Sequence, residues 1–372
     1  MTSVELVVVD GIDDPARPTG GNVYHRRLRD GLVAAGWDVR LHALAGNWPV
    51  PEPAAMAELR SILAAMPDGA AILIDGLIAS AVPALLQPHA RRLRIVVMMH
   101  MPLGLASPAG HLPAARRGEG AALAATHAVV TTSRWTRDRL LELYPLGPRR
   151  VFVVPPGVDA AGLAPGSRDG SRLLCVGTVA AHKGQDVLLT ALSQLPDQHW
   201  RCDCVGMLDC EPDFVRKLMA QSAASGIEDR LSLLGPRVGA ELDRLYDRAD
   251  VLVVASRFEA YGMVISEALA RGIPVIASSV GGIPEAMGLT RAGGRPGLLV
   301  PAQDPAALSA ALRRWLSDGR LRASLRGLAR QVRPTLARWE ETAAVMAQVL
   351  TEIGSHPVEP VRSRGRMSVG QR

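Results

Sequence analysis

The chain has few cysteines, few aromatic residues and almost no lysine, and these shortages limit what it can be. Four cysteines in 372 residues are too few for a disulfide framework and fit a reducing compartment. Cys202, Cys204 and Cys210 lack the paired spacing of a zinc ribbon, so we predict no metal site there. Aromatic residues make up only 3% of the chain, so alanine, valine and leucine must supply most of the buried surface.

Long apolar runs and targeting signals are also missing. The apolar run 95–106 contains His100 and Pro102 and is too short to span a bilayer. The first ten residues carry neither a basic segment nor a cleavage site, so we expect no signal peptide and a cytoplasmic location.

The net charge of +6 comes from residues of both signs spread along the chain, which excludes a basic tail for nucleic acid. The positive balance suits an anionic substrate or peripheral contact with an anionic membrane surface. An arginine-rich composition without functional meaning explains it equally well.

Strand-length apolar runs alternate with segments of helical periodicity along the chain. This alternation predicts an α/β fold with parallel sheets and right-handed crossovers. Pro155–Gly157 separates two such series and is the expected hinge. We predict two doubly wound, Rossmann-like domains, 1–154 and 155–334, facing each other across a cleft. One more helix is expected at 335–352, and 353–372 is expected to be disordered because it has almost no apolar residues.

The stretch 255–285 carries the strongest functional pattern. An apolar strand at Val251–Ser256 leads into a loop, and Gly262 opens a segment of helical periodicity. Glu259 should therefore lie just before a helix N-terminus and Glu267 within that helix, about 7–10 Å apart along its axis. Between them lie free backbone N–H groups and the positive end of the helix dipole, which together suit a phosphate.

Two carboxylates beside a phosphate site suit hydroxyl ligands, because a carboxylate can accept two hydrogen bonds from a vicinal diol. A ligand that has a diol, then phosphates, then a second diol is a sugar nucleotide. Two solvated glutamates on an ordinary α/β unit would explain the same residues equally well.

The string E-A-Y-G-M-V-I-S-E closely resembles the E-(seven residues)-E motif of the family-four retaining glycosyltransferases, and S-R-F before it and V-G-G-I-P-E after it also fit. The resemblance implies nucleotide-sugar donors, a B-type fold of two Rossmann-like domains and a C-terminal helix that packs back on the first domain. It implies that Glu267 binds the ribose and that Glu259 holds hydroxyls of the transferred sugar. The backbone of Ala260, Tyr261 and Gly262 is expected against that sugar and the phosphates.

Gly20 and Gly21 lie between the first strand and its helix. Two glycines let a ligand approach the backbone closely, and a helix N-terminus follows. The pattern is not G-x-G-x-x-G, which weakens a dinucleotide interpretation. It resembles the family's Gly-Gly loop, which lies over the donor phosphates and the acceptor, although a plain strand-to-helix turn would look the same.

Lysine occurs only at positions 183 and 217. Lys183 follows a strand at a helix start, where an ammonium could stabilise a departing diphosphate. The family usually has an arginine where this chain has Thr178. Either Thr178 binds the phosphate, or another cation such as Arg257 substitutes, or activity is weak. A solvated lysine side chain is the alternative.

His100 ends the strand 94–100 and resembles the histidine that the family places near the reacting sugar. A structural role in the fold is the alternative. Ser133 follows the strand before the next helix, where it can act as an N-cap, and the family pattern also makes it a cleft residue. We expect Gly281 and Gly282 to form the turn that opens a later helix.

These residues predict retaining transfer of a hexose-type sugar from a nucleoside-diphosphate sugar to an unidentified hydroxyl acceptor, lipid-linked or soluble. Lys183, Glu259 and His100 are the predicted catalytic residues. No carboxylate is recognisable beneath the anomeric carbon, which favours attack on the face that the diphosphate leaves. The sequence has no D-x-D motif at a strand end, so we expect neither a metal nor a cofactor. An inverting transferase with His100 as base, a sugar-nucleotide epimerase, a phosphorylase and a non-catalytic nucleotide-sugar-binding protein remain alternatives.

Overall fold

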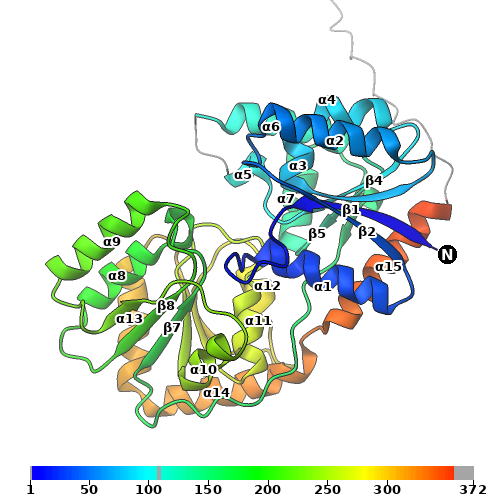
Figure 1. Ribbon diagram of the computed structural model, residues 1–372. Helices are drawn as coiled ribbons and strands as arrows, with labels where there is room; N and C mark the ends of the chain where they lie inside the picture. The colour runs from blue at the N-terminus through cyan, green and yellow to red at the C-terminus, as the bar shows by residue number, and fades with distance from the viewer. Residues whose placement is uncertain (1, 107–109, 356–372) are drawn as a thin grey trace, which may run out of the picture.

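The computed structural model describes residues 2–106 and 110–355. Two parallel six-stranded sheets, each with helices on both faces, form the two halves of the chain (Figure 1). This arrangement confirms the predicted α/β class. Within the described ranges, no helix is both long and apolar enough to cross a membrane.

The first half contains a sheet in the strand order β2-β1-β3-β4-β5-β6. Its strands are β1 (Ser3–Val9), β2 (Asp38–Leu44), β3 (Ala71–Asp75), β4 (Arg94–Met99), β5 (Ala128–Thr131) and β6 (Val151–Val153). Its helices are α1 (Gly20–Ala34), α2 (Pro53–Ala65), α3 (Gly76–Ala81), α4 (Pro83–Leu86), α5 (Leu103–Ala106), α6 (Leu112–Ala124) and α7 (Arg134–Leu143), with 3₁₀ turns at Gln87–His89 and Pro148–Arg150.

The apolar strands of this sheet are covered on both faces, because alternate side chains point in opposite directions. Val4, Leu6 and Val8 pack with α1 and the last helix, α15 (Trp339–Ser355). Val7 faces the other way and packs with α2, α3, α6 and α7. Because both faces are buried, these strands need apolar residues at nearly every position.

The second half contains a sheet in the strand order β12-β11-β10-β7-β8-β9. Its strands are β7 (Arg172–Val176), β8 (Arg201–Val205), β9 (Leu231–Leu233), β10 (Val251–Val254), β11 (Val275–Ser278) and β12 (Gly297–Val300). Its helices are α8 (Gln185–Ser193), α9 (Pro212–Ala224), α10 (Ala240–Arg248), α11 (Met263–Ala270), α12 (Ile283–Met287), α13 (Pro305–Ser317) and α14 (Gly319–Val332), with 3₁₀ turns at Ala181–Lys183 and Arg333–Thr335.

Two segments connect the halves and lie against each other. The backbone N–H of Val158 donates to the carbonyl of Ala337 at 2.9 Å. A Cβ atom at Gly157 would lie only 2.3 Å from the backbone nitrogen of Trp339, so only glycine allows this approach. The two halves lie on either side of the predicted hinge Pro155–Gly157, and movement about it stays a prediction.

Helix α15 leaves the second half and packs beside α1 of the first (Figure 1). The contact is close, because a Cβ atom at Gly31 would lie 2.6 Å from Cβ of Ala343. The helix expected from residue 335 begins at Trp339 instead, because a 3₁₀ turn occupies Arg333–Thr335. Residues 353–355 of the expected disordered tail belong to α15, and 356–372 lie outside the described residues.

The strand order identifies one crevice in each half. β1 lies between β2 and β3, and β7 lies between β8 and β10. In each sheet the chain therefore builds outward on one side of this strand and then continues on its other side. In open parallel sheets, ligands bind at such reversal points, outside the carboxyl ends of the strands. The loops that follow β1, β3, β7 and β10 are therefore the expected ligand-binding loops.

Candidate functional site

The loops after β7 and β10 bring two of the predicted catalytic residues together. Nζ of Lys183 lies 2.6 Å from Oε2 of Glu259, and both side chains are mostly buried. Gly184 makes this approach feasible: it has a φ of +70°, and a Cβ there would lie 2.1 Å from the carbonyl oxygen of Ala255. Because β7 and β10 are neighbours, this ion pair lies at the reversal point of the second sheet.

Two glycines, Gly281 and Gly282, pack closely against the loop that carries Glu259. A Cβ at Gly281, where φ is +56°, would lie 1.7 Å from the carbonyl oxygen of Glu259. A Cβ at Gly282 would lie 2.2 Å from the carbonyl oxygen of Ala260, and the N–H of Gly282 donates to Glu259 at 2.9 Å. Only a turn was expected at these glycines, because their contact with a loop 22 residues earlier exists only in the folded chain.

The loop that carries Glu259 ends where α11 begins. Gly262 is the N-cap of α11, with a φ of +94°, and as a glycine it has no side chain that could cap the first turn. Its N-terminal N–H groups remain available to an anionic ligand.

Glu267 lies on α11 and is held by residues that the sequence did not point to. Its Oε2 accepts a hydrogen bond of 2.7 Å from the hydroxyl of Tyr246 on α10. The guanidinium of Arg271 lies 4.6 Å from the centre of the Tyr246 ring. Burial raises the pKa of Glu267, while Tyr246 and Arg271 oppose that rise. A tyrosine twenty-one residues upstream gave no signal in the sequence.

Arg257, the cation expected as a substitute for the family arginine, is paired with Asp186. The guanidinium of Arg257 donates to both carboxylate oxygens of Asp186 at 2.7 Å and to the carbonyl of Ala181 at 2.6 Å. The carbonyl of Thr178 accepts a hydrogen bond of 3.0 Å from Gln185. In this structure Lys183, and not Arg257, is therefore the cation that pairs with Glu259.

The glycine loop of the first half lies near residues of both halves. Thr19 caps α1 by accepting a hydrogen bond from the N–H of Asn22 at 3.1 Å. A Cβ at Gly20 would lie 3.7 Å from Sδ of Met263, the first residue of α11, and one at Gly21 would lie 4.0 Å from Cδ2 of His100. The loop therefore bridges His100 and the start of α11.

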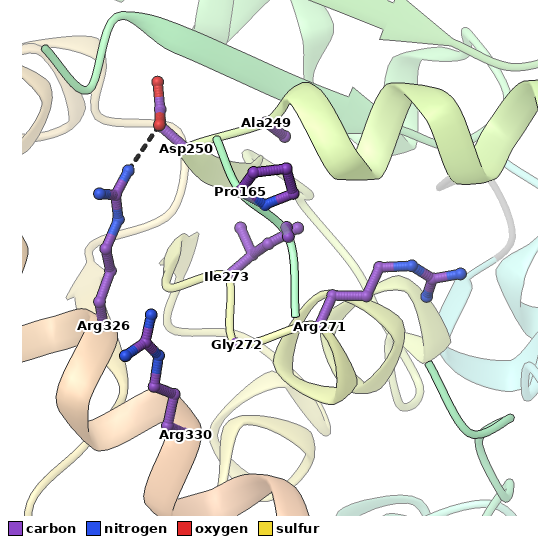
Figure 2. Close-up of a pocket in the computed structure, with 9 residues that line it drawn as sticks. Pro165, Ala249, Asp250, Arg271, Gly272, Ile273, Arg326 and Arg330 are labelled. Atoms are coloured by element: carbon purple, nitrogen blue, oxygen red, sulfur yellow. Dashed lines mark hydrogen bonds and ion pairs between the residues drawn. The ribbon is translucent and has the colours of Figure 1, made fainter. Parts of the chain in front are cut away.

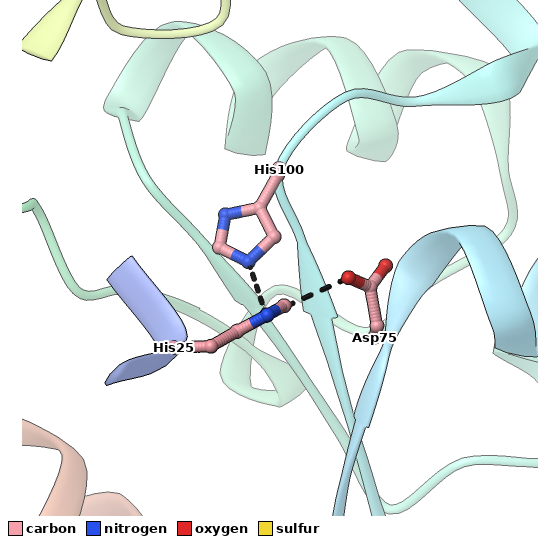
Figure 3. Close-up of side chains that lie close together, drawn as sticks. All are labelled: His25, Asp75 and His100. Carbon is pink, nitrogen blue, oxygen red and sulfur yellow. Dashed lines mark hydrogen bonds and ion pairs between the residues drawn. The ribbon is translucent and has the colours of Figure 1, made fainter. Parts of the chain in front are cut away.

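His100 follows β4 and is bound to a second histidine (Figure 3). Its Nε2 lies 2.7 Å from Nε2 of His25 on α1, and that nitrogen lies 3.6 Å from Oδ2 of Asp75 at the end of β3. Burial lowers the pKa of His100 to about 4 and that of His25 well below its usual range, and it raises the pKa of Asp75 to about 6. His25 and Asp75 were not predicted, because neither stands in a recognisable motif.

Polar contacts also join the two halves directly. Oγ of Ser133 accepts from the N–H of Thr136 at 3.0 Å, which confirms its predicted role as N-cap of α7, and it donates to the carbonyl of Ala260 at 2.6 Å. The carboxylate of Glu285 accepts from the N–H of Arg134 at 2.9 Å, so an acid of the second half lies at the positive end of α7.

A separate hollow lies at the opposite edge of the second sheet (Figure 2). It is lined by Ala249 and Asp250 before β10 and by Arg271, Gly272 and Ile273 before β11. These residues precede their strands, whereas ligands of such sheets bind beyond the carboxyl ends. We therefore place the candidate site beyond the carboxyl ends of β7 and β10, where Lys183 and Glu259 lie.

Two family models match the sequence, one in each half. Residues 18–161 match Glycosyltransferase Family 4, and residues 166–332 match Glycosyl transferases group 1. The chain belongs to the family-four glycosyltransferases. This result confirms the family that the motif around Glu259 and Glu267 resembles.

Curated relatives of this family-four chain are identical to it at about a third of the aligned positions. A D-inositol 3-phosphate glycosyltransferase of Xylanimonas cellulosilytica is 33% identical over 252 residues, which cover 63% of this chain and 59% of that protein. A second one, from Catenulispora acidiphila, is 35% identical over 229 residues, covering 55% of this chain and 53% of the relative. The matches thus span little more than half the length of these relatives.

Solved structures show the same fold over nearly the whole chain. Sucrose-phosphate synthase from Thermosynechococcus elongatus superposes with a TM-score of 0.79 at 24% identity, covering 95% of this chain and 99% of that one. Anabaena HepE in complex with UDP-glucose gives a TM-score of 0.76 at 18% identity, covering 95% and 100%. The predicted B-type fold of two Rossmann-like domains is therefore confirmed.

Proposed function

We propose that this family-four glycosyltransferase moves a hexose-type sugar, with retention, from a nucleoside-diphosphate sugar to an acceptor hydroxyl. The observation that carries the proposal is the Lys183–Glu259 ion pair at the reversal point of the second sheet, directly before the uncapped start of α11. Cation, carboxylate and free N–H groups are the partners that a diphosphate and a sugar require at one place.

Without a donor, the two charges of this pair compensate each other. When the donor binds, Lys183 turns to the diphosphate and Glu259 accepts hydrogen bonds from hydroxyls of the sugar. Lys183 then has an anionic partner and Glu259 has hydrogen-bond donors, so neither charge is left without a partner in this mostly buried site, where an isolated charge would be costly. In this proposal Glu267, further along α11, accepts hydrogen bonds from hydroxyls of the ribose.

The reaction breaks the bond between the anomeric carbon and the β-phosphate oxygen, and the electron pair leaves with that oxygen. Lys183 and the N–H groups of α11 stabilise the negative charge that develops there. The acceptor oxygen bonds to the same face of the anomeric carbon, and its proton passes to the departing phosphate oxygen. Configuration is retained, and this chain needs no metal to supply the positive charge.

Relatives guide the choice of donor and acceptor. HepE binds UDP-glucose, so UDP-hexoses are the first donors to test and GDP-hexoses the second. The curated relatives are named for D-inositol 3-phosphate, so a phosphorylated cyclitol is the first acceptor, and a lipid-linked hydroxyl is the second.

The test replaces Lys183 with alanine. If it stabilises the leaving group, kcat falls about 10²–10³-fold, as when one preorganised donor to a developing oxyanion is removed. Lys217 is the only other lysine, and it lies exposed on α9, so Lys217→Ala is a matched control that should keep the parent activity. Equal turnover by both variants would remove Lys183 from the mechanism.

One observation favours a second candidate, a donor-binding protein without turnover. Thr178 stands where the family usually has an arginine, and Arg257 is committed to Asp186. This candidate predicts that UDP-hexose binds but that no product forms with any acceptor. Product analysis by NMR decides between the two, and the anomeric configuration of the product separates retention from inversion.

A further inference from the structure

Three side-chain atoms that could each bind a metal or a hydrogen lie together at the reversal point of the first sheet, apart from the Lys183–Glu259 pair of the second sheet. They are Nε2 of His25, Nε2 of His100 and Oδ2 of Asp75, and all lie within 4.8 Å of one another (Figure 3). His25 is 1% exposed and Asp75 6%, so solvent contributes little to this group. Either a hydrogen of the protein itself or a metal ion bound by it must therefore lie between the three atoms.

A shared proton fits the distances better than a metal does. The two imidazole nitrogens are 2.7 Å apart, which is a hydrogen-bond length. Two nitrogens bound to one tetrahedral zinc at 2.0–2.1 Å would be about 3.3 Å apart. The group therefore holds an N–H···N hydrogen bond, and only one of the two nitrogens can carry that hydrogen.

Asp75 decides which nitrogen carries the hydrogen. Its Oδ1 accepts from the N–H of Leu77 at 2.7 Å, which leaves Oδ2 facing Nε2 of His25 at 3.6 Å. A hydrogen on that nitrogen is attracted to the carboxylate, whereas a lone pair there would be repelled. Nε2 of His25 is then the donor, and Nε2 of His100 is the acceptor.

The other ring nitrogen of His100 must carry the remaining hydrogen, because a neutral imidazole has one N–H. Burial holds the pKa of His100 near 4, so the ring is neutral at pH 7. Figure 3 shows this second nitrogen, Nδ1, on the ring edge turned away from His25 and Asp75. The ring itself is fixed by Tyr24, which packs edge-on against it with centroids 4.9 Å apart.

We propose that His25 and Asp75 are positioning residues that hold His100 as its Nδ1–H tautomer, so that His100 presents an N–H donor to the sugar site. The role at the sugar rests on the proposed function, whereas the tautomer does not. A nitrogen that carries a hydrogen cannot accept the proton of an attacking hydroxyl. The inverting alternative, with His100 as general base, is therefore disfavoured by the residues behind it.

The experiment uses the full chain labelled with ¹⁵N-histidine, in which long-range proton–nitrogen spectra distinguish the two tautomers. His100 should show a protonated Nδ1 in the parent. His25→Phe fills the space without a donor and should shift His100 toward the Nε2–H form. His25→Gln keeps an N–H donor and should restore the Nδ1–H form. Asp75→Asn keeps the bond to Leu77 without the charge and should leave a mixture of tautomers.

Turnover provides the second readout. We expect His25→Phe to lower kcat about tenfold, the value of one lost hydrogen bond, and His25→Gln to recover most of that loss. An Nε2–H form of His100 in the parent would overturn the proposal. So would one equivalent of zinc that remains after dialysis in the parent and is absent from His25→Phe. If the tautomers follow the prediction but no UDP-hexose or GDP-hexose is turned over, the proposed function fails while the positioning role stands.

Discussion

The carboxyl of Asp75 should cost the folded protein stability at neutral pH. Burial raises its pKa from the usual 3.8 to about 6. Each tenfold change in an equilibrium is worth about 1.4 kcal/mol, so this rise corresponds to roughly 3 kcal/mol. Because the folded pKa is the higher one, the cost is absent below about pH 4, grows between about pH 4 and 6, and is complete above that range.

Asp75→Asn tests this reasoning, since asparagine is neutral at every pH and can still accept the hydrogen bond from Leu77 at the start of α3. The variant should match the parent at pH 4 and be more stable by up to about 3 kcal/mol at pH 7. Urea unfolding followed by circular dichroism from pH 4 to 8 measures the difference.

Asp318→Asn is the matched control. Asp318 caps α14, and the N–H groups of Leu321 and Arg320 lower its pKa. Its stabilising contribution is present at neutral pH and is lost as the pH falls, so this variant should be less stable than the parent at pH 7 and match it in acid. A stability difference for Asp75→Asn that is constant with pH, or that has the sign of Asp318→Asn, would refute the argument. A constant difference would show that the pKa of Asp75 is the same in the folded and unfolded protein, and the reversed sign would show that the folded protein stabilises its carboxylate.

Two further substitutions test the donor site. Gly281→Ala places a Cβ 1.7 Å from the carbonyl of Glu259 at a φ of +56°, so it should destabilise the protein by about 2–4 kcal/mol and weaken UDP-glucose binding. Gly327→Ala is the control, because a Cβ at this position within α14 would meet no other atom within 4 Å. It should lower neither the stability measured by thermal unfolding nor the UDP-glucose affinity measured by calorimetry. Tyr246→Phe removes the hydroxyl donor to the half-buried carboxylate of Glu267, which raises the pKa of that group further. UDP-glucose should bind about tenfold more weakly, and this loss should shrink as the pH rises and the carboxylate ionises, whereas a loss that is the same at every pH would contradict the role of Glu267.

The sequence was informative wherever neighbouring residues carry the signal. Apolar runs of strand length alternating with helical periodicity predicted two parallel α/β halves, because burial on both faces requires nearly continuous apolar strands. Glu259, Gly262 and Glu267 lie within one strand-loop-helix unit, so their places before and within α11 followed from local periodicity. The end of the chain was less well predicted, because nothing in the local pattern shows that a 3₁₀ turn precedes Trp339.

Other residues of the site could be found only from the folded chain. These residues make contacts between separate elements of the chain. Tyr246 contacts Glu267, Gly281 packs against Glu259, and His25 lies between His100 and Asp75.

By itself the amino-acid sequence determined the class of fold, the family and the loops that carry the predicted donor-binding residues, because these depend on periodicity and on motifs within single units. Tertiary structure alone decided which side chains neutralise, orient or crowd those residues. The physical reason is that charge compensation, tautomer choice and close backbone approach depend on distances of a few ångströms between different elements, and strand order rather than chain order sets those distances.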